Sequence, residues 1–204
     1  ALALSQERTA TAESFLAGIV VGYEVGSRLG AASQLRGAMH PHGTWGTLGA
    51  AAACGRVAGL DDNDMRQTIN ISASLTTATS KQTMLEGGLV RNVYAGMSNR
   101  NGLLALNLAE CGFNGERDGP SSLLGKIISE SLQPEAVTQG LGHDWHLMRN
   151  YFKLHSCCRY NHGTLDAIDL MAAAQRLPQV SDIERIEVVT YHLAAELNDP
   201  APTN

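Results

Sequence analysis

The segment 12–30 carries the strongest constraint on the fold, because a glycine recurs in it at every fourth position. These glycines are Gly18, Gly22, Gly26 and Gly30. Apolar residues between them repeat at helical spacing, so we predict a helix in which the missing side chains form one stripe. Each glycine costs a helix about 1 kcal/mol relative to alanine. The close approach of another helix is the simplest compensation, and we interpret the stripe as a packing signal.

Composition narrows the class of protein. Apolar residues make up 44% and charged residues 17% of the 204 residues, which predicts a sizeable core and excludes a disordered tail, a coiled coil and a collagen-like repeat. The formal net charge of -5 argues against a general nucleic-acid binder, which needs a basic face. The sequence has no apolar run of about 20 residues, so we expect no spanning helix.

Further helices follow from apolar periodicity and end signals. We expect them at 47–58, 63–75, 98–111, 120–131 and 164–177. Gly59 should end the first of these helices, and Asp61 or Asp62 should cap the second. The segment 76–88 is polar and turn-prone.

The predicted secondary structure changes after Gly140. The segment 145–155 could be a strand leading into a loop, and the alternating residues 183–193 predict a half-buried strand. The fold class is therefore mostly α: an all-helical domain at 1–140, followed at 141–204 by the beginning of a smaller α/β domain.

The chain ends and the cysteines bear on its context. The sequence begins without Met and ends in a turn-rich stretch at 198–204, so we expect a piece of a longer polypeptide. Cys54 and Cys111 lie in apolar helical patterns typical of buried thiols, and the pair Cys157–Cys158 is not a CxxC motif. A reducing compartment fits these cysteines best.

Three clusters could carry chemistry. The first is the loop 40–46, where His40 and His42 precede a helix and could hold a carboxylate and move a proton. The second is 86–96, in which glycines flank Arg91, whose guanidinium pairs with carboxylates in a bidentate fork. The alternative for the first cluster is a surface turn whose histidines only bond to backbone. The alternative for the second is a connection between helices with a solvated arginine.

The third cluster is 153–162, which brings Lys153, Arg159 and His162 into one stretch directly before a helix. A solvated charged face is the alternative, but cysteines and aromatic residues interleave these charges and favour a functional loop. A cysteine nucleophile is possible, although nothing assigns a base to Cys157 or Cys158. The sequence contains no Walker loop, GxSxG or HExxH motif.

Together, these stretches resemble the MmgE/PrpD family, the 2-methylcitrate dehydratase-like proteins. The matching residues are 21–25, 28–30, 40–53, 90–96 and 151–162, in family order. The resemblance implies a helical domain followed by a smaller α/β lid. It also implies a cytoplasmic homodimer that acts on small polycarboxylates without a metal or organic cofactor. Members include 2-methylcitrate dehydratase, cis-aconitate decarboxylase and iminodisuccinate epimerase.

The resemblance also suggests individual site residues. His40 matches the histidine of the family's HPxGTWG loop, Arg91 falls where the decarboxylase branch has an active-site lysine, and Lys153 and His162 match the ends of the CCR-type motif. Cys158 falls where the decarboxylase has another histidine, so the sequence departs from that enzyme at two positions. An arginine does not readily give up a proton.

These matches lead to a mechanistic hypothesis of proton abstraction next to a carboxylate. We expect His40, Arg91 and His162 to be catalytic, with His40 as base or acid and His162 as second proton carrier. We expect Arg91, Lys153, Arg159 and Trp45 to bind substrate, and no residue to bind a metal. The expected reaction is that of a dehydratase, and the alternatives are an epimerase of the same family or an inactive fragment that assembles with a partner.

Overall fold

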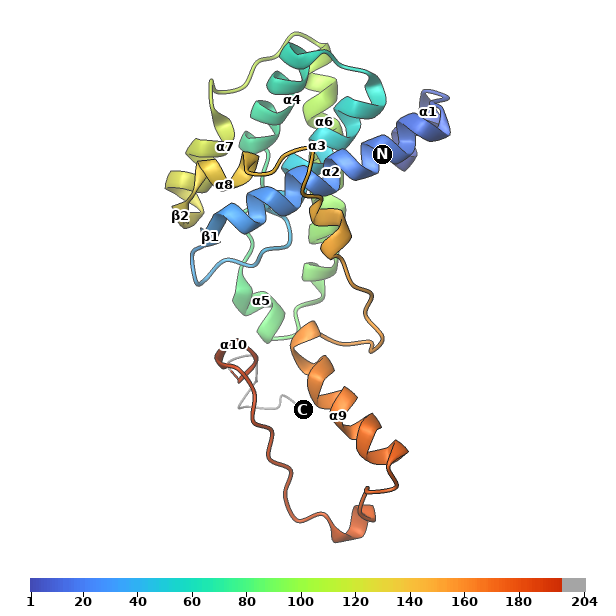
Figure 1. Ribbon diagram of the computed structural model, residues 1–204. Coiled ribbons are helices and arrows are strands. Elements are labelled where there is room, and N and C mark those ends of the chain that lie inside the picture. The colour runs from blue at the N-terminus through green and yellow to red at the C-terminus, as the bar shows by residue number, and fades with distance from the viewer. Residues whose placement is uncertain (196–204) are drawn as a thin grey trace. The chain divides into compact units, whose positions relative to one another are not determined.

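The computed structural model describes residues 1–195 (Figure 1). The turn-rich stretch expected at 198–204 lies outside the described residues. The chain divides into two compact units, Ala1–Asn150 and Tyr151–Asn204, which are described separately below.

The first unit is built from helices and one small sheet. Its α-helices are α1 (Leu2–Glu7), α2 (Ala12–Ala32), α3 (Trp45–Ala58), α4 (Asp62–Ser74), α5 (Lys81–Leu85), α6 (Tyr94–Glu110), α7 (Gly119–Ser122) and α8 (Pro134–Thr138). Shorter helical turns are η1 (Leu89–Val93), η2 (Leu123–Ile127) and η3 (His146–Arg149), and the strands are β1 (Ser33–Leu35) and β2 (Ser129–Leu132).

The glycine stripe of α2 faces α3, as the sequence predicted. A Cβ on Gly18 would come 2.6 Å from Cγ2 of Val57, and one on Gly22 would come 2.7 Å from Cβ of Ala53. Such distances are shorter than van der Waals contact, so only glycine lets the two helices lie this close (Figure 1).

Helix α3 is the centre of the core. Its residues Leu48, Ala51 and Ala52 are fully buried, and the helix packs against α2, α4 and α6. A second close approach joins α3 to α6, where a Cβ on Gly102 would come 2.5 Å from Cβ of Ala50. Small side chains on α3 therefore allow helices to pack on several of its sides.

The predicted helix ends are confirmed. Gly59 follows the last turn of α3 in the left-handed conformation, with φ of 71°. Asp61 caps α4, because its side chain accepts a hydrogen bond from the backbone N–H of Asp64 at 2.9 Å.

The two-stranded sheet was not predicted. Strand β1 pairs antiparallel with β2, with Ser33 opposite Leu132, and these strands are far apart in the sequence. Strands this short carry too little alternation to stand out in a sequence. The predicted helix at 120–131 is consequently shorter, because β2 occupies its last residues.

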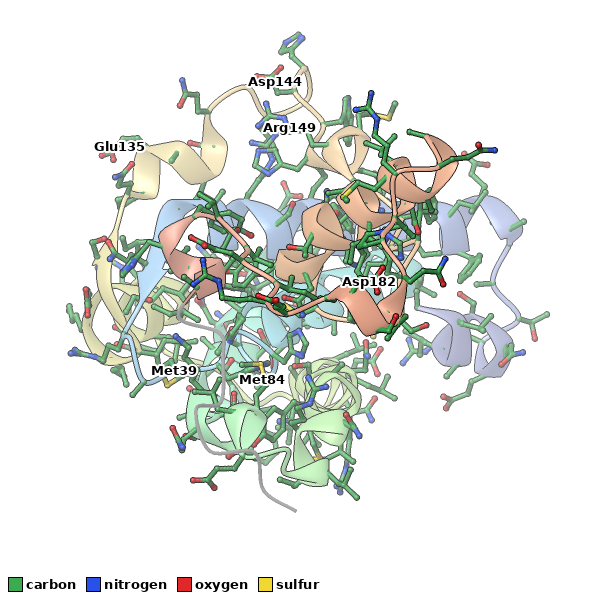
Figure 2. All side chains as sticks on the ribbon, turned by 90° about the horizontal axis from the view of Figure 1, so that it is seen from below. Met39, Met84, Glu135, Asp144, Arg149 and Asp182 are labelled. Atoms are coloured by element: carbon green, nitrogen blue, oxygen red, sulfur yellow. The ribbon has the colours of Figure 1, made fainter. Side chains whose placement is uncertain are left out.

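A buried ion pair fixes the end of the first unit to α2. Nε of Arg28 lies 2.9 Å from Oε2 of Glu24, and both residues are buried. The Arg28 guanidinium also donates to the carbonyl oxygens of Val137, Gln139 and Asp144, and Oε1 of Glu24 accepts from the N–H of Leu147. The segment after α8, which carries the labelled Asp144 in Figure 2, is thus held by groups from one turn of α2.

The second unit is also helical as far as it is described. It contains α9 (His162–Ala173), α10 (His192–Ala195) and the turns η4 (Arg159–Asn161) and η5 (Val180–Asp182). The predicted helix at 164–177 ends early, and Gln175 has a positive φ of 55°.

Both strands expected after Gly140 are wrong. Residues 183–191 form no strand in the described part of the chain, and Val189 is 93% exposed. Alternation produces a strand only where a neighbouring strand takes its backbone N–H and C=O groups. The segment expected to be a strand at 145–155 contains η3 instead.

The chain is mostly α, as its helical periodicity predicted, and the helical unit Ala1–Asn150 is followed by a smaller unit. Among residues 1–195, no helix combines the length and the apolar character needed to cross a membrane. Cys54 is buried as predicted, whereas Cys111, just beyond the end of α6, is exposed.

Candidate functional site

The first candidate site is the loop at 39–44, between β1 and α3. Its conformation is set by the segment 76–80, which was predicted only as a polar turn. The backbone N–H of His40 donates to the carbonyl oxygen of Thr79 at 2.8 Å. The Thr79 hydroxyl lies 3.1 Å from the carbonyl oxygen of His40 and 2.7 Å from that of His42. One threonine therefore holds the backbone at both histidines.

Gly43 is required by the same loop. Its φ of +100° lies in the region that favours glycine, and a Cβ there would come 2.9 Å from Oγ1 of Thr77. Thr77 also donates its backbone N–H to the Gly43 carbonyl at 3.3 Å. The glycine thus lets the loop turn against the threonine segment.

His40 is buried, with 4% of its surface exposed, and one of its ring nitrogens is already occupied. The backbone N–H of His42 donates to Nδ1 of His40 at 3.1 Å, and the two imidazole rings meet edge to face with centroids 4.4 Å apart. Because Nδ1 accepts a hydrogen bond, a neutral His40 ring carries its proton on Nε2. The ring therefore offers an N–H donor, with no free lone pair.

The surroundings of His40 keep it neutral. Burial lowers the pKa of His40, and the positive charges of His42 and Arg91 lower it further, against the opposing hydrogen bond from the His42 backbone. The sequence left open whether these histidines bond only to backbone. The structure brings together a backbone-bonded imidazole and the Arg91 charge.

Arg91 and Tyr94 lie where η1 runs into α6. Arg91 is exposed on η1, and the Tyr94 ring at the first position of α6 lies 6.0 Å from the His40 ring. Tyr94 had no predicted role, because one aromatic residue at a helix start is equally typical of packing. Its spacing of three residues from Arg91, about one helical turn, is the signal that could have found it.

Trp45 begins α3, and its indole N–H is hydrogen-bonded within the first unit. The indole Nε1–H donates to Oγ of Ser33 at 2.8 Å, and the ring lies 3.3 Å from where a Cβ on Gly30 would be. Trp45 therefore packs against α2, and only its ring surface could contact a substrate.

The predicted residues of the second unit make separate contacts. Nζ of Lys153 donates to the Cys157 carbonyl at 3.2 Å, and the Arg159 guanidinium lies 4.9 Å from the centre of the Tyr151 ring. Both cations are exposed. The cysteines Cys157 and Cys158 are free thiols.

His162 is the buried member of this set. It opens α9 with 4% exposure, and its Nε2 has no hydrogen-bond partner within the described part of the chain. The His155 ring meets it edge to face at 5.0 Å, and Nε2 of His155 lies 2.9 Å from Oδ1 of Asp166. Neither His155 nor Asp166 was predicted as a site residue, since their pairing depends on the turn before α9.

One group among the described residues has the composition of a metal site. His155, Asp166 and Asp169 each offer a ligand atom, and these atoms lie within 4.8 Å of one another. Both aspartates are exposed and His155 is already bonded to Asp166, so the group is satisfied as a histidine–carboxylate pair.

A pocket of about 900 Å³ lies within the second unit, between α9 and residues 186–191. Arg159, Tyr151, Tyr160 and Tyr191 contribute to its wall. The pocket contains a cation and aromatic rings, which suits a small anion with an apolar part.

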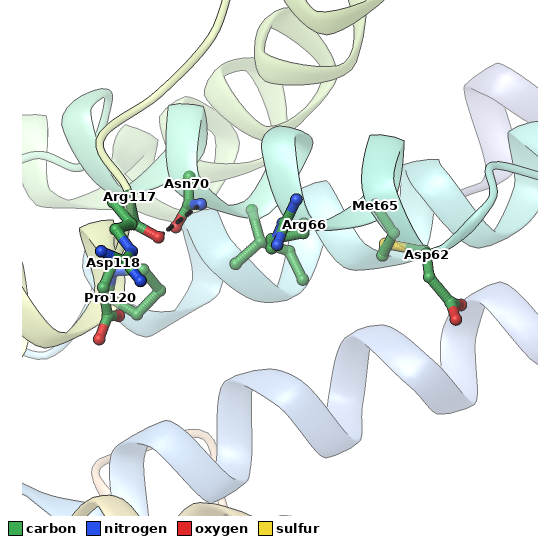
Figure 3. A pocket seen from close by; sticks show the side chains of 8 residues that line it. Asp62, Met65, Arg66, Asn70, Arg117, Asp118 and Pro120 are labelled. Carbon is green, nitrogen blue, oxygen red and sulfur yellow. Dashed lines mark hydrogen bonds between the residues drawn. The ribbon is translucent and has the colours of Figure 1, made fainter.

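A second pocket, of about 490 Å³, lies against α4 in the first unit (Figure 3). Arg66 and Arg117 alternate there with Asp62 and Asp118, and none of the predicted site residues lines it. All four of these side chains are exposed, as is typical of a solvated charged surface.

The sequence is similar to proteins of Aspergillus species. The chain is 28% identical to cis-aconitate decarboxylase of Aspergillus terreus over 207 residues, covering 95% of this chain and 42% of that protein. It is 29% identical to the cis-aconitate decarboxylase-like protein oryM of Aspergillus oryzae over 191 residues, covering 85% of this chain and 39% of that protein. The chain thus spans about two fifths of the length of these relatives.

The model of the MmgE/PrpD N-terminal domain matches residues 1–121. These residues include the glycine-packed helices α2 and α3 and the loop that holds His40, together with Arg91 and Tyr94. With more than half of its length matched in this way, the chain belongs to the MmgE/PrpD family.

Proposed function

We propose that the protein containing this chain is a cofactor-independent lyase, a dehydratase similar to 2-methylcitrate dehydratase, acting on a small polycarboxylate. In this reaction a base removes the proton alpha to a carboxylate, the carbon–hydroxyl bond breaks, and the hydroxyl group leaves as water after it is protonated. The observation that carries the proposal is the buried His40 ring, whose pKa is lowered by its burial and by the nearby charges of His42 and Arg91.

His40 acts in this proposal as a hydrogen-bond donor. Its Nδ1 accepts from the His42 N–H, so only Nε2–H can face a substrate. A neutral imidazole that donates to a carboxylate oxygen stabilises the enolate-like charge that develops when the alpha proton leaves. Of the two roles expected from the sequence, the hydrogen bond thus favours a donor over a base.

Arg91 complements this donor as a carboxylate clamp. Its guanidinium makes no hydrogen bond among the described residues, so its N–H groups are open to a bidentate carboxylate. An arginine holds its charge throughout such a reaction, which suits binding better than proton transfer.

The residues of the second unit have the remaining roles in the proposal. Lys153 and Arg159 are exposed cations for further carboxylates, and His162 is the second proton carrier. With His40 in the donor role, His162 is the candidate base, and its Nε2 is not bonded to another of the described residues. Trp45 offers its ring face as a contact for the substrate.

The test is a substrate screen with the full-length protein. Small polycarboxylates, including 2-methylcitrate and cis-aconitate, are incubated in deuterated buffer, and the absorbance of a new double bond, released carbon dioxide and deuterium in recovered substrate are measured. Water elimination supports the proposal. Deuterium exchange with inversion and no net conversion would identify an epimerase, and carbon dioxide release a decarboxylase like the named relatives.

The matched variants are His40→Ala and His143→Ala. Loss of the donor should lower turnover by about 100-fold or more, while the exposed His143 should be replaceable without effect. An unchanged rate in folded His40→Ala protein would exclude the donor role. No turnover in any preparation would favour the remaining alternative, an inactive piece that assembles with a partner.

Assembly and location extend the proposal on the resemblance alone. We propose a cytoplasmic homodimer in which residues 1–140 belong to the helical domain and 141–204 begin the lid. Light scattering on the full-length protein measures the mass of the assembly, and a monomer would contradict the dimer.

A further inference from the structure

The start of α9 contains a buried histidine, His162. His162 is 4% exposed, and its Nε2 has no hydrogen-bond partner among residues 1–195. An imidazole that carries a proton needs a fixed ring orientation, and that orientation usually comes from a hydrogen bond to the other nitrogen or from close packing.

A neighbouring ring supplies the packing. The His155 ring meets His162 edge to face, with centroids 5.0 Å apart and an angle of 78° between the rings. This is the geometry in which aromatic rings attract each other. A change in the His155 orientation would therefore be transmitted to His162.

A carboxylate fixes His155 in turn. Nε2 of His155 lies 2.9 Å from Oδ1 of Asp166, so Nε2–H donates to the carboxylate and the tautomer is defined. Asp166 stands four residues after His162 in α9, on the same face of the helix. The helix thus sets the spacing between the Asp166 carboxylate and His162, and Asp166 orients His162 through His155.

We infer that Asp166 and His155 form a positioning pair for His162. The inference rests on the proposed function only where it speaks of turnover, because the orientation of the ring is measurable without a substrate. The pair does not touch the substrate and exchanges no proton with it. Asp166 holds His155 through a hydrogen bond, and the His155 ring holds the orientation of the His162 ring by edge-to-face packing.

The first test is spectroscopic and uses full-length protein labelled with ¹⁵N-histidine. The ring signals of His162 are assigned from their absence in His162→Gln protein. Asp166→Ala and His155→Ala should shift or broaden these signals. Asp166→Asn keeps an acceptor oxygen for His155 and should largely restore them. Unchanged His162 signals in both alanine variants would overturn the inference.

Asp169→Ala is the matched control. Asp169 lies on the same helix, and one of its carboxylate oxygens is within 4.8 Å of the ligand atoms of the pair, but its side chain makes no hydrogen bond in the described part of the chain. Asp169→Ala removes the same charge as Asp166→Ala but keeps the His155–Asp166 hydrogen bond, so the His162 signals should stay in place. A shift as large as that in Asp166→Ala would contradict positioning by the hydrogen bond.

The second test uses turnover once a substrate is known. Misplacing a reacting group by about 1 Å costs up to about 100-fold in rate, so Asp166→Ala should lower kcat by about 10- to 100-fold and leave KM within about twofold. His155→Phe keeps a ring against His162 and should lose less than His155→Ala. His155→Phe also allows turnover to be measured if His155→Ala does not fold.

Failure of this inference and failure of the proposed function give different results. If His162→Gln turns over normally, His162 is not the proton carrier, and the spectra alone decide whether the pair orients it. If His162→Gln is inactive while Asp166→Ala and His155→Ala keep full kcat, the proposed function stands and the positioning role is excluded.

Discussion

Gly22 of α2 and Gly49 of α3 each occupy the space that a Cβ on the other helix would need. A Cβ on Gly22 would lie 2.7 Å from the Gly49 carbonyl oxygen, and a Cβ on Gly49 would lie 2.6 Å from the Gly22 carbonyl oxygen. The two backbones are therefore in mutual contact, with no side chain between them. This contact lies next to the start of α3, where the His40 loop enters the helix.

Replacing Gly22 by alanine should destabilise the protein despite the higher helix propensity of alanine. The added methyl group meets backbone and Ala53 rather than a flexible side chain, so we expect a loss of about 1–3 kcal/mol in the free energy of unfolding, measured by urea denaturation. Gly96→Ala in α6 is the control, because nothing lies within 4 Å of its Cβ position. That variant should gain up to about 1 kcal/mol, and equal effects at both sites would contradict the packing argument.

Removing the buried Arg28 should cost far more than removing an exposed arginine. Arg28→Met leaves the Glu24 carboxylate unpaired in the core and frees the carbonyls after α8, so we expect a loss of about 3–5 kcal/mol in unfolding free energy. Arg8→Met breaks the more exposed pair with Glu110 and should cost about 1 kcal/mol or less. Similar losses in denaturation of the two variants would show that burial does not set the cost.

The Glu24 carboxylate should make stability depend on pH in the acid range. Burial raises the pKa of Glu24, but the Leu147 N–H and Arg28 outweigh it, so the pKa is lowered overall. Because the pKa of Glu24 is lowered in the folded state, its stabilisation is fully present at a pH above the ordinary carboxyl pKa. It is lost as the pH falls from there through the lowered pKa of the folded state. The difference in unfolding free energy between wild type and Glu24→Gln should therefore shrink on acidification. The same substitution at the exposed Glu135 of α8 (Figure 2) should show no such trend, and a constant Glu24 difference would refute the assignment.

Removing the Arg91 charge should raise the pKa of His40. Burial is the main cause of the lowered pKa and stays in place, while the repulsion from Arg91 is lost in Arg91→Met. The ring signals of His40 in an NMR titration should then change at higher pH than in wild type. Arg100→Met, at an exposed position of α6, should leave the titration where it was. An unchanged or lowered His40 pKa in Arg91→Met would show that Arg91 does not act on His40.

The sequence determined the local features of this protein. The helix at 12–30, its glycine stripe against another helix, the end at Gly59 and the cap at Asp61 were all predicted. The helix, the position of the stripe on one of its faces and the helix ends depend on residues within a turn or two along the chain, so the pattern of side chains is enough to specify them. The candidate residues His40, Arg91 and His162 were likewise found from local clusters.

Only the tertiary structure determined which groups these residues contact. The tautomer of His40 depends on a backbone N–H in its own loop, and that loop is held by Thr79 from a distant segment. The Glu24–Arg28 pair is buried because the segment after α8 packs over it. The alternation at 183–191 predicted a strand, yet pairing requires a neighbour that no local pattern supplies. Helices close their hydrogen bonds within themselves, whereas buried polar groups and strands obtain partners from remote parts of the chain, and for this reason the sequence alone did not reveal them.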